Sequence, residues 1–272
     1  MDLSAKQIEN LCHHYGEALE VSQEEVAGSF SSSSDELHYA MVDGSFIFSR
    51  EKGWTEAKVG RIFKSEDNFM LSEKRKSIHS STYIAHIGSH TDFTNKLAPS
   101  LDSLRHLIFV ADGATWIWNW VSSTYPNAIQ ILDFYHVVEK VCQWATLVFK
   151  DKQELTHWRK TAKELLLSSK ITELLHHIRQ IETKGEKADK QKSLITYIEN
   201  NRQRMDYANY LEKEYLIGSG AIEAAQRTVV QQRLKRSGQR WTIKGAQQVV
   251  NLRTKNLSGQ WKQVNQLIRK AA

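Results

Sequence analysis

The sequence predicts an α/β fold, a mixed sheet interrupted by an all-helical insertion. Two apolar runs, 107–111 and 128–132, each have the length of a buried strand, and each ends in an aspartate, Asp112 and Asp133. The segment between them is long enough for a crossover helix, so the two strands are expected to be parallel neighbours. Residues 137–214 then keep helical spacing throughout, which predicts the insertion.

The chain before these strands begins with a predicted helix and linker. Helical spacing covers 1–26, and its apolar positions at i, i+3, i+4 and i+7 are Ile8, Leu11, Cys12 and Tyr15. Residues 28–34, which include four consecutive serines, are expected to be a linker.

Three strand patterns and a helix follow the linker. The strand patterns lie at 38–49, 56–64 and 77–87. A helix is expected to begin at a cap, Thr91 or Asp92, and to run towards Leu104 with an interruption near Pro99. The predicted order is therefore three strands, a helix, two strands and a last helix.

Composition excludes several classes of protein. No run of about 18 apolar residues is present, so no membrane span is expected. The start of the chain lacks a basic and apolar signal segment, and Cys12 and Cys142 are too far apart for a CxxC pair. These features predict a cytoplasmic protein without a zinc ribbon or a disulfide framework.

Charge is distributed unevenly along the chain. The net charge is +6, but no Asp or Glu follows Glu223, and the 11 Lys and Arg residues there leave the first 223 residues at −5. Such a one-sided basic segment indicates a polyanion partner, whereas an ordinary solvated helix face would include some acids. The candidate DNA contacts are Arg227, Arg233, Lys235, Arg236, Arg240 and Lys244.

Three carboxylates stand at positions suited to chemistry, although each has an ordinary explanation. Asp43 precedes Gly44, a pair typical of a hairpin turn. Asp112 ends a strand that leads into a helix, where open α/β sheets bind their ligands. Glu223 follows the glycine-rich entry 218–220, in a first helical turn that favours an acid and that Ser219 would cap.

The order of elements is that of an RNase H-like fold. In that fold the first strand lies beside the fourth, which would make Asp43 and Asp112 neighbours, and the last helix would bring Glu223 towards them. Clustered carboxylates need cations, and hard oxygen ligands favour Mg²⁺ or Mn²⁺. Two such ions about 3.5–4 Å apart would activate a hydroxyl and stabilise the leaving oxygen of a phosphodiester.

Several ordered motifs resemble those of DDE transposases of bacterial insertion sequences, from the branch related to the Mutator and hAT transposases. The resemblance covers about residues 38–255. The motifs are Val42-Asp43-Gly44 with 53–61, Ala111-Asp112-Gly113-Ala114 with Trp116-Ile117-Trp118, Leu132-Asp133-Phe134-Tyr135-His136, and 218–223 with 231–241. Relatives place a helical insertion between the fifth strand and the last catalytic helix, as at 137–214.

The resemblance implies a function and a division of roles. Asp43, Asp112 and Glu223 would be the catalytic, metal-binding triad, with two Mg²⁺ or Mn²⁺ ions. Asp133 and His136 form an Asp-x-x-His signature with a supporting role, and a histidine at a helix start bonded to Asp133 is the equally open alternative. The expected reaction is hydrolysis of DNA at transposon ends followed by strand transfer to target DNA. The expected state is a nucleoid-associated homo-oligomer.

The predicted organisation has four parts, and the first departs from the family. They are an N-terminal helical remnant with its linker at 1–35, the first catalytic part at 36–136, the insertion at 137–214, and the last helix with the basic tail at 215–272. Relatives carry a longer upstream region that recognises transposon ends. A truncated transposase, a catalytically silent or domesticated DNA-binding protein, and another RNase H-like nuclease therefore stay open as alternatives.

Overall fold

The computed structural model describes residues 2–22, 36–72 and 75–271, and the predicted linker at 28–34 lies outside the described residues. The chain divides into two compact units. Unit one is Met1–Ile108, Ser123–Ala128 and Gly220–Ala272, and unit two is Phe109–Ser122 and Ile129–Ser219.

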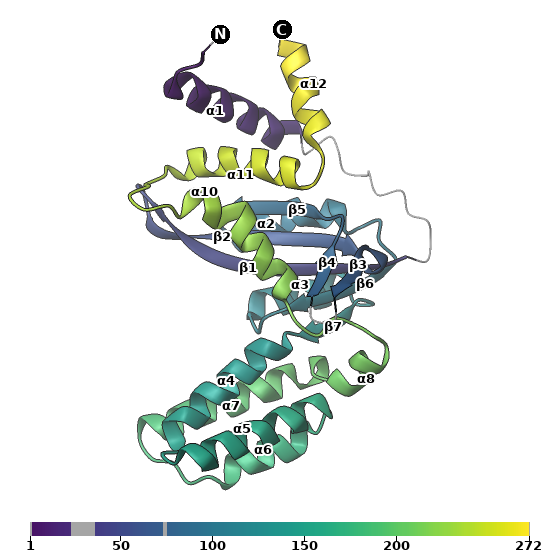
Figure 1. Cartoon of the computed structure of the whole chain (residues 1–272), viewed down its shortest axis with the longest axis vertical. Helices are drawn as coiled ribbons and strands as arrows, with labels where there is room; N and C mark the ends of the chain where they lie inside the picture. Colours follow the sequence, from purple (N-terminus) through teal and green to yellow (C-terminus); the bar gives the residue numbers. More distant parts are fainter. Residues whose placement is uncertain (1, 23–35, 73–74, 272) are drawn as a thin grey trace. The chain divides into compact units, whose positions relative to one another are not determined.

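A five-stranded mixed sheet has its first strand at the centre (Figure 1). Its strands are β1 (Leu37–Ser49), β2 (Gly53–Lys64), β5 (Thr82–Ile87), β6 (His106–Ala111) and β7 (Ile129–Leu132), in the order β5-β2-β1-β6-β7. β2 pairs antiparallel with both β1 and β5, and β6 passes from unit one into unit two. This strand order confirms the predicted RNase H-like fold class.

Two details of the strands differ from the sequence prediction. The pattern expected at 77–87 is split, because β4 (Arg75–Ile78) pairs with β3 (Asn68–Ser72) in a separate hairpin and only β5 joins the main sheet. The hairpin-turn interpretation of Asp43-Gly44 is wrong. Both residues lie inside β1, opposite Val59 and Lys58 of β2, because pairing along the whole strand outweighs the local turn preference.

Helices of unit one cover the sheet and extend beyond it (Figure 1). They are α1 (Ala5–Ser22), α2 (His90–Leu97), α9 (Gly220–Ala225), α10 (Gln232–Leu234), α11 (Ile243–Leu257) and α12 (Trp261–Ala271). α11 packs on β5, and α1 and α12 pack on α11.

Close helix packing decides which face of α1 is buried. A Cβ at Gly16 would lie 2.3 Å from the backbone oxygen of Gln248, so only glycine permits this approach of α1 to α11. Leu19 is buried in the contact, whereas Ile8 and Leu11 are exposed. The predicted apolar stripe is therefore wrong for its first half.

Helix α2 begins at least two residues earlier than predicted and is short. The cap is Ser89 and not Thr91 or Asp92 as predicted. The hydroxyl of Ser89 accepts a hydrogen bond from the backbone nitrogen of Asp92. The helix ends at Leu97, and a 3-10 turn at Ala98–Ser100 contains Pro99. The interruption expected near that proline is thus observed.

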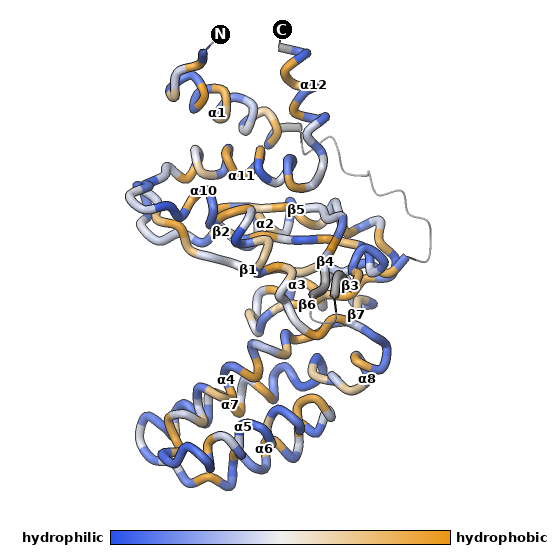
Figure 2. The backbone as a smooth tube through the Cα atoms, in the orientation of Figure 1, coloured by the Kyte–Doolittle hydropathy of each residue, from blue (hydrophilic) through white to orange (hydrophobic). Residues whose placement is uncertain are grey.

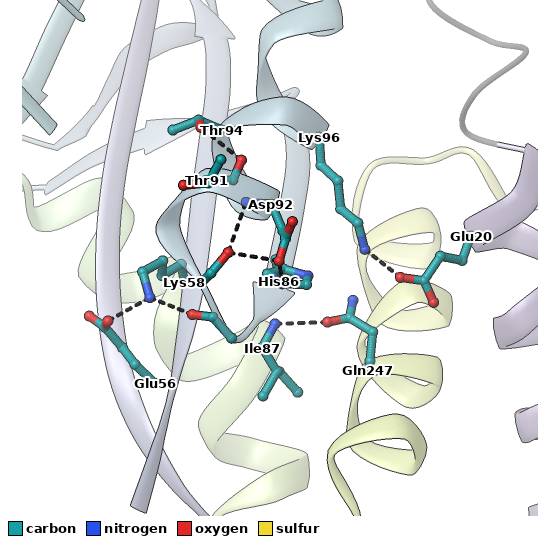
Figure 3. A network of polar contacts seen from close by, with 12 residues as sticks. Glu20, Glu56, Lys58, His86, Ile87, Thr91, Asp92, Thr94, Lys96 and Gln247 are labelled. Carbon is teal, nitrogen blue, oxygen red and sulfur yellow. Dashed lines mark hydrogen bonds and ion pairs between the residues drawn. The ribbon is translucent and has the colours of Figure 1, made fainter. Parts of the chain in front are cut away.

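A polar network links α2 and β5 to the helices packed against them (Figure 3). Lys58 forms an ion pair of 2.6 Å with Glu56 and donates to the carbonyl of Gly88. The side chain of Gln247 on α11 accepts a hydrogen bond from the backbone of Ile87. These bonds give buried polar groups partners and fix α11 on the sheet edge.

Unit two contains the predicted helical insertion and the turn that follows β6. Its helices are α3 (Thr115–Thr124), α4 (Phe134–Val148), α5 (Lys152–Leu167), α6 (Ile171–Gln180), α7 (Glu186–Asn201) and α8 (Tyr207–Glu212). Hydrophobic and hydrophilic residues alternate along α4 to α7, as Figure 2 shows, and Trp144, Leu166 and Leu174 are buried between these helices. Among the described residues, no helix is long and apolar enough to cross a membrane.

Candidate active site

Asp43 lies on the central strand, where one glutamine fixes a helix against it. The side-chain nitrogen of Gln226 donates to the backbone oxygen of Asp43 at 2.7 Å and to that of Ala57 at 3.3 Å. The side-chain oxygen of Gln226 accepts from the hydroxyl of Ser45 at 2.9 Å. Gln226 is buried, so these three bonds satisfy its amide away from water.

Glu223 lies in the first turn of α9 and is exposed to solvent. A second anchor holds this helix on β2, because the guanidinium of Arg61 donates to the carbonyl of Ala221 at 2.8 Å. Arg61 also donates to the hydroxyl of Ser81, and burial lowers the pKa of its guanidinium. Within unit one, the helix of Glu223 is therefore joined to β1 through Gln226 and to β2 through Arg61.

The helix of Glu223 widens into a π-helical turn over Gln226–Gln231 before it continues as α10. Such turns free backbone groups and occur frequently at functional sites. The guanidinium of Arg253 on α11 donates to the carbonyls of Val229 and Thr228. Arg253 therefore has a structural role, although the sequence places it among the cations of the tail.

Asp112 lies in unit two, in the turn after β6, and is held from both sides. Its carboxylate accepts from the backbone nitrogen of Ala114 at 3.0 Å, and its carbonyl accepts from the indole of Trp118 at 2.7 Å. The next residue is Gly113, where a Cβ would lie 2.1 Å from Cε2 of Tyr197. The turn therefore leaves no space for a larger residue at position 113 while Tyr197 keeps its place.

Tyr197 of α7 is a neighbour of Asp112 that the sequence did not indicate. Its hydroxyl is buried and makes no hydrogen bond with any residue that the structure describes. Burial, followed by the negative charges of Asp112 and Asp133, raises the pKa of Tyr197. The phenol thus stays protonated and can donate a hydrogen bond to a group bound near Asp112. Only the long-range packing of α7 reveals this residue.

Asp133 is completely buried and caps α4. Its carboxylate accepts from the backbone nitrogen of His136 at 2.9 Å and from that of Ser219 at 2.7 Å, and it lies 3.4 Å from Nδ1 of His136. Burial alone would raise the pKa of Asp133, but the hydrogen bonds from His136 and Ser219 outweigh it and lower the pKa. His136 thus lies at the start of α4 with its backbone nitrogen bonded to Asp133, and the supporting role of the two residues stays a prediction.

The candidate DNA-binding residues of the basic segment differ in their exposure and in whether their side chains already contact another residue. Arg227, Lys235, Arg236 and Arg240 are exposed. The guanidinium of Arg233 lies 5.1 Å from the ring centre of Trp241, and Lys244 pairs with Glu17 of α1 at 2.6 Å.

The predicted triad is divided between the units: Asp43 and Glu223 belong to unit one, and Asp112 belongs to unit two. Within unit one, the strand of Asp43 and the helix of Glu223 are brought together. In unit two, the turn of Asp112 lies beside Tyr197. The roles of the three carboxylates as metal ligands stay a prediction.

Comparison with known proteins places the chain in a family. Among solved structures it is similar to the Drosophila P element transposase strand transfer complex, with 8% sequence identity over 98% of this chain and 81% of that chain, and a TM-score of 0.30. No curated protein matches the chain. The sequence pattern of UPF0236 matches residues 2–270, and the chain therefore belongs to this uncharacterised protein family.

Proposed function

We propose that the chain is a transposase-type enzyme that cleaves and joins DNA strands by metal-dependent phosphoryl transfer. The observation that carries the proposal is the attachment of the helix of Glu223 to the strand of Asp43 through Gln226. That attachment occurs in an RNase H-like sheet whose strand β6, the neighbour of β1, leads directly into Asp112. All three carboxylates thus belong to the elements that carry catalytic acids in this fold.

The donor set fits hard divalent cations. Asp43, Asp112 and Glu223 would hold Mg²⁺ or Mn²⁺, because carboxylate oxygens are the ligands these ions prefer. When bound, two such ions supply the charge that stabilises the attacking and leaving oxygens of a phosphodiester. Asp133 is a positioning residue in this proposal, since its carboxylate is already engaged by the backbone of His136 and of Ser219.

The basic segment supports a DNA substrate. Lys235, Arg236 and Arg240 are exposed, and in the described part of the chain no acidic residue follows Glu223. Cations of this kind bind phosphates, which positions DNA without reading its sequence. Tyr197 would add a protonated donor beside Asp112.

The test is a strand-cleavage and joining assay with Mg²⁺ on supercoiled plasmid and on linear duplex that carries the DNA flanking the gene. Asp43→Asn, Asp112→Asn and Glu223→Gln should each lower cleavage by about 100-fold or more, because each removes a charged metal ligand. Glu66→Gln, at an exposed acid in the same unit as Asp43, is the control and should cleave normally. Far-UV circular dichroism should show all four variants folded.

The products distinguish the proposal from its alternatives. Joined strands support a transposase. Cleavage without joining would indicate another RNase H-like nuclease. DNA binding without any product would indicate a DNA-binding protein that no longer cuts.

A further inference from the structure

An aromatic surface lies at the far end of the β1–β2 hairpin. Phe46, Phe48 and Trp54, named here the hairpin face, are 54%, 40% and 68% exposed. Phe48 pairs directly with Trp54 across the two strands, and their rings meet edge to face with centres 5.6 Å apart. Phe46 is two residues before Phe48 and therefore shares its side of the ladder. The three rings form one patch.

The ladder beneath these rings is firmly held. On the other side of β1, Ile47 is buried, and the hydroxyl of Ser49 donates to the carbonyl of Gly53 and bonds to that of Thr55. Single exposed apolar residues are common on proteins, but three aromatic rings side by side on a rigid strand pair are not. Rings that are fixed in place lose little side-chain entropy when they bind a flat partner.

The hairpin face is separate from the candidate catalytic carboxylate. Phe46 follows Asp43 by three residues, and side chains alternate along a strand, so the two point to opposite faces of the sheet. The aromatic patch therefore needs a ligand of its own.

Cations surround the hairpin face, while the nearby acids are engaged. Arg50 and Lys52 are exposed in the turn. The carboxylate of Glu51 accepts from the backbone of Ile243, and Glu56 pairs with Lys58. Arg50, Lys52 and Lys58 against Glu51 and Glu56 leave this end of the hairpin with a net charge of 3 − 2 = +1.

The same turn is attached to the basic segment. The backbone nitrogen of Arg50 donates to the carbonyl of Trp241 at 2.8 Å, and Ser49 forms a β-bridge with Trp241. The ring of Trp241 carries the guanidinium of Arg233. The hairpin end and the loop between α10 and α11 can be followed together in Figure 1. Backbone contacts therefore join the end of the hairpin that carries the aromatic rings to the basic segment within unit one.

Rings beside cations fit a polyanion whose flat apolar groups are accessible. Unpaired bases of a single strand meet this description, because each base has a free face for stacking and each phosphate a negative charge. Bases in a duplex are already stacked on one another. A protein partner would fit the rings but would leave the cations without a counterpart.

We propose that the hairpin face stacks on unpaired bases of a single DNA strand whose phosphates contact the adjoining basic segment. This inference rests on the proposed function for the choice of DNA and names the form of DNA that this surface accepts. A strand opened next to a cleavage position is the form in which such bases become available.

The experiment measures binding of the full chain, in EDTA and at fixed salt, to three probes of about 20 nucleotides. They are oligo(dT), an abasic strand with the same phosphates, and a duplex. Wild type should bind oligo(dT) about tenfold or more tightly than the abasic strand, because stacking adds to the phosphate contacts. Trp54→Ala and Phe46→Ala should lose most of that preference and should bind the abasic strand and the duplex as wild type does. Trp54→Phe should retain part of the preference.

Phe69→Ala is the matched control, since Phe69 is also an exposed aromatic residue on a hairpin of unit one. It should bind all three probes normally. Equal loss for every probe, or no loss for oligo(dT), would overturn the inference. A change in sedimentation mass without a change in binding would overturn it too, and would assign the hairpin face to contact between copies. Because EDTA removes catalysis, failure of cleavage and failure of base stacking are observed separately.

Discussion

The side-chain amide of Gln226 donates a hydrogen bond of 2.7 Å to the backbone carbonyl of Asp43, a residue 183 positions away in sequence. A second bond to Ala57 and a third from Ser45 surround the same amide. One buried side chain thus connects the helix of Glu223 to strands β1 and β2. The placement of Glu223 relative to Asp43 depends on it.

Replacing Gln226 by alanine should lower the free energy of unfolding by roughly 1–3 kcal/mol, since buried carbonyls of Asp43 and Ala57 lose their donor. Chemical denaturation measures the loss. Gln231→Ala is the control, because Gln231 lies in the same π-helical turn but is exposed, and it should change stability by less than about 0.5 kcal/mol. Equal effects of the two variants would contradict this role of Gln226.

Asp133→Ala should destabilise the protein by roughly 2 kcal/mol or more. The substitution removes a helix cap and also leaves the buried backbone nitrogen of Ser219 without an acceptor. Asp151→Ala provides the comparison, since Asp151 caps α5 in the same unit but at an exposed position. It should cost about 1 kcal/mol. Similar losses in thermal or urea unfolding would argue against a special anchoring role for Asp133.

Gly113→Ala should destabilise unit two by roughly 1–3 kcal/mol, because the new methyl group would lie 2.1 Å from the ring of Tyr197. In the Tyr197→Ala background, Gly113→Ala should cost much less stability than it does in wild type, because the ring that the methyl group would meet is absent. A double-mutant cycle of unfolding free energies measures this coupling. Additive effects of the two substitutions would mean that the clash is relieved elsewhere.

His86 should make stability depend on pH in a defined window. Burial, with a contribution from Lys96, lowers the pKa of His86 to about 4 from an ordinary 6.5. Above pH 6.5 the imidazole is neutral in both the folded and unfolded chain. Between pH 6.5 and 4 the unfolded chain takes up a proton that the folded chain does not. The free energy of unfolding therefore decreases as the pH is lowered through this window, and the loss is complete below about pH 4.

The check is the slope of unfolding free energy against pH over that window. His86→Gln should flatten the slope. His79→Gln, at an exposed histidine of the same unit, should leave it as in wild type. An unchanged slope in the His86 variant would show that other groups carry the dependence.

Cations of the basic segment should contribute unequally to the salt dependence of DNA binding. Arg236→Gln and Arg240→Gln should each make the slope of log K against log salt shallower by about 0.9, the value for one phosphate contact. Lys244→Gln should change it less, because Lys244 is already paired with Glu17. Titration of a duplex at several salt concentrations gives the slopes. A larger effect at Lys244 would show that DNA displaces Glu17.

Hydrophobic spacing in the sequence is sufficient to locate a strand or helix whose position depends mainly on burial of its apolar residues. The apolar run that forms β6 and the helical stripe of α4 are buried along most of their length, so hydrophobic spacing located both. The same pattern failed for α1. There the docking face is set by Gly16, whose missing side chain admits the backbone of α11. A hydrophobicity pattern does not record the space that a small residue leaves.

Polar roles in the candidate site were less accessible from sequence. Asp43, Asp112 and Glu223 could be named as candidates because each has a local sign in the sequence: Asp43 precedes a glycine, Asp112 follows a strand, and Glu223 follows a glycine-rich helix entry. Gln226 and Tyr197 carry no such local mark, since their partners Asp43 and Gly113 lie in distant segments. Asp133 differs from these two residues. A sequence motif pointed to it, and the structure shows it as the buried cap of α4.

The π-helical turn at Gln226–Gln231 makes the length of this segment as important as its composition. Each residue of an α-helix turns the chain by about 100°. Deleting one residue here would convert the wide turn to regular α-helix and rotate everything after it by that angle. Gln226 would still face Asp43, but α10, which carries Arg233, would point in a different direction relative to Gln226. The segment can therefore change side chains at its exposed positions, while a single-codon deletion would change the orientation of α10 and its basic side chains relative to the turn that carries Glu223.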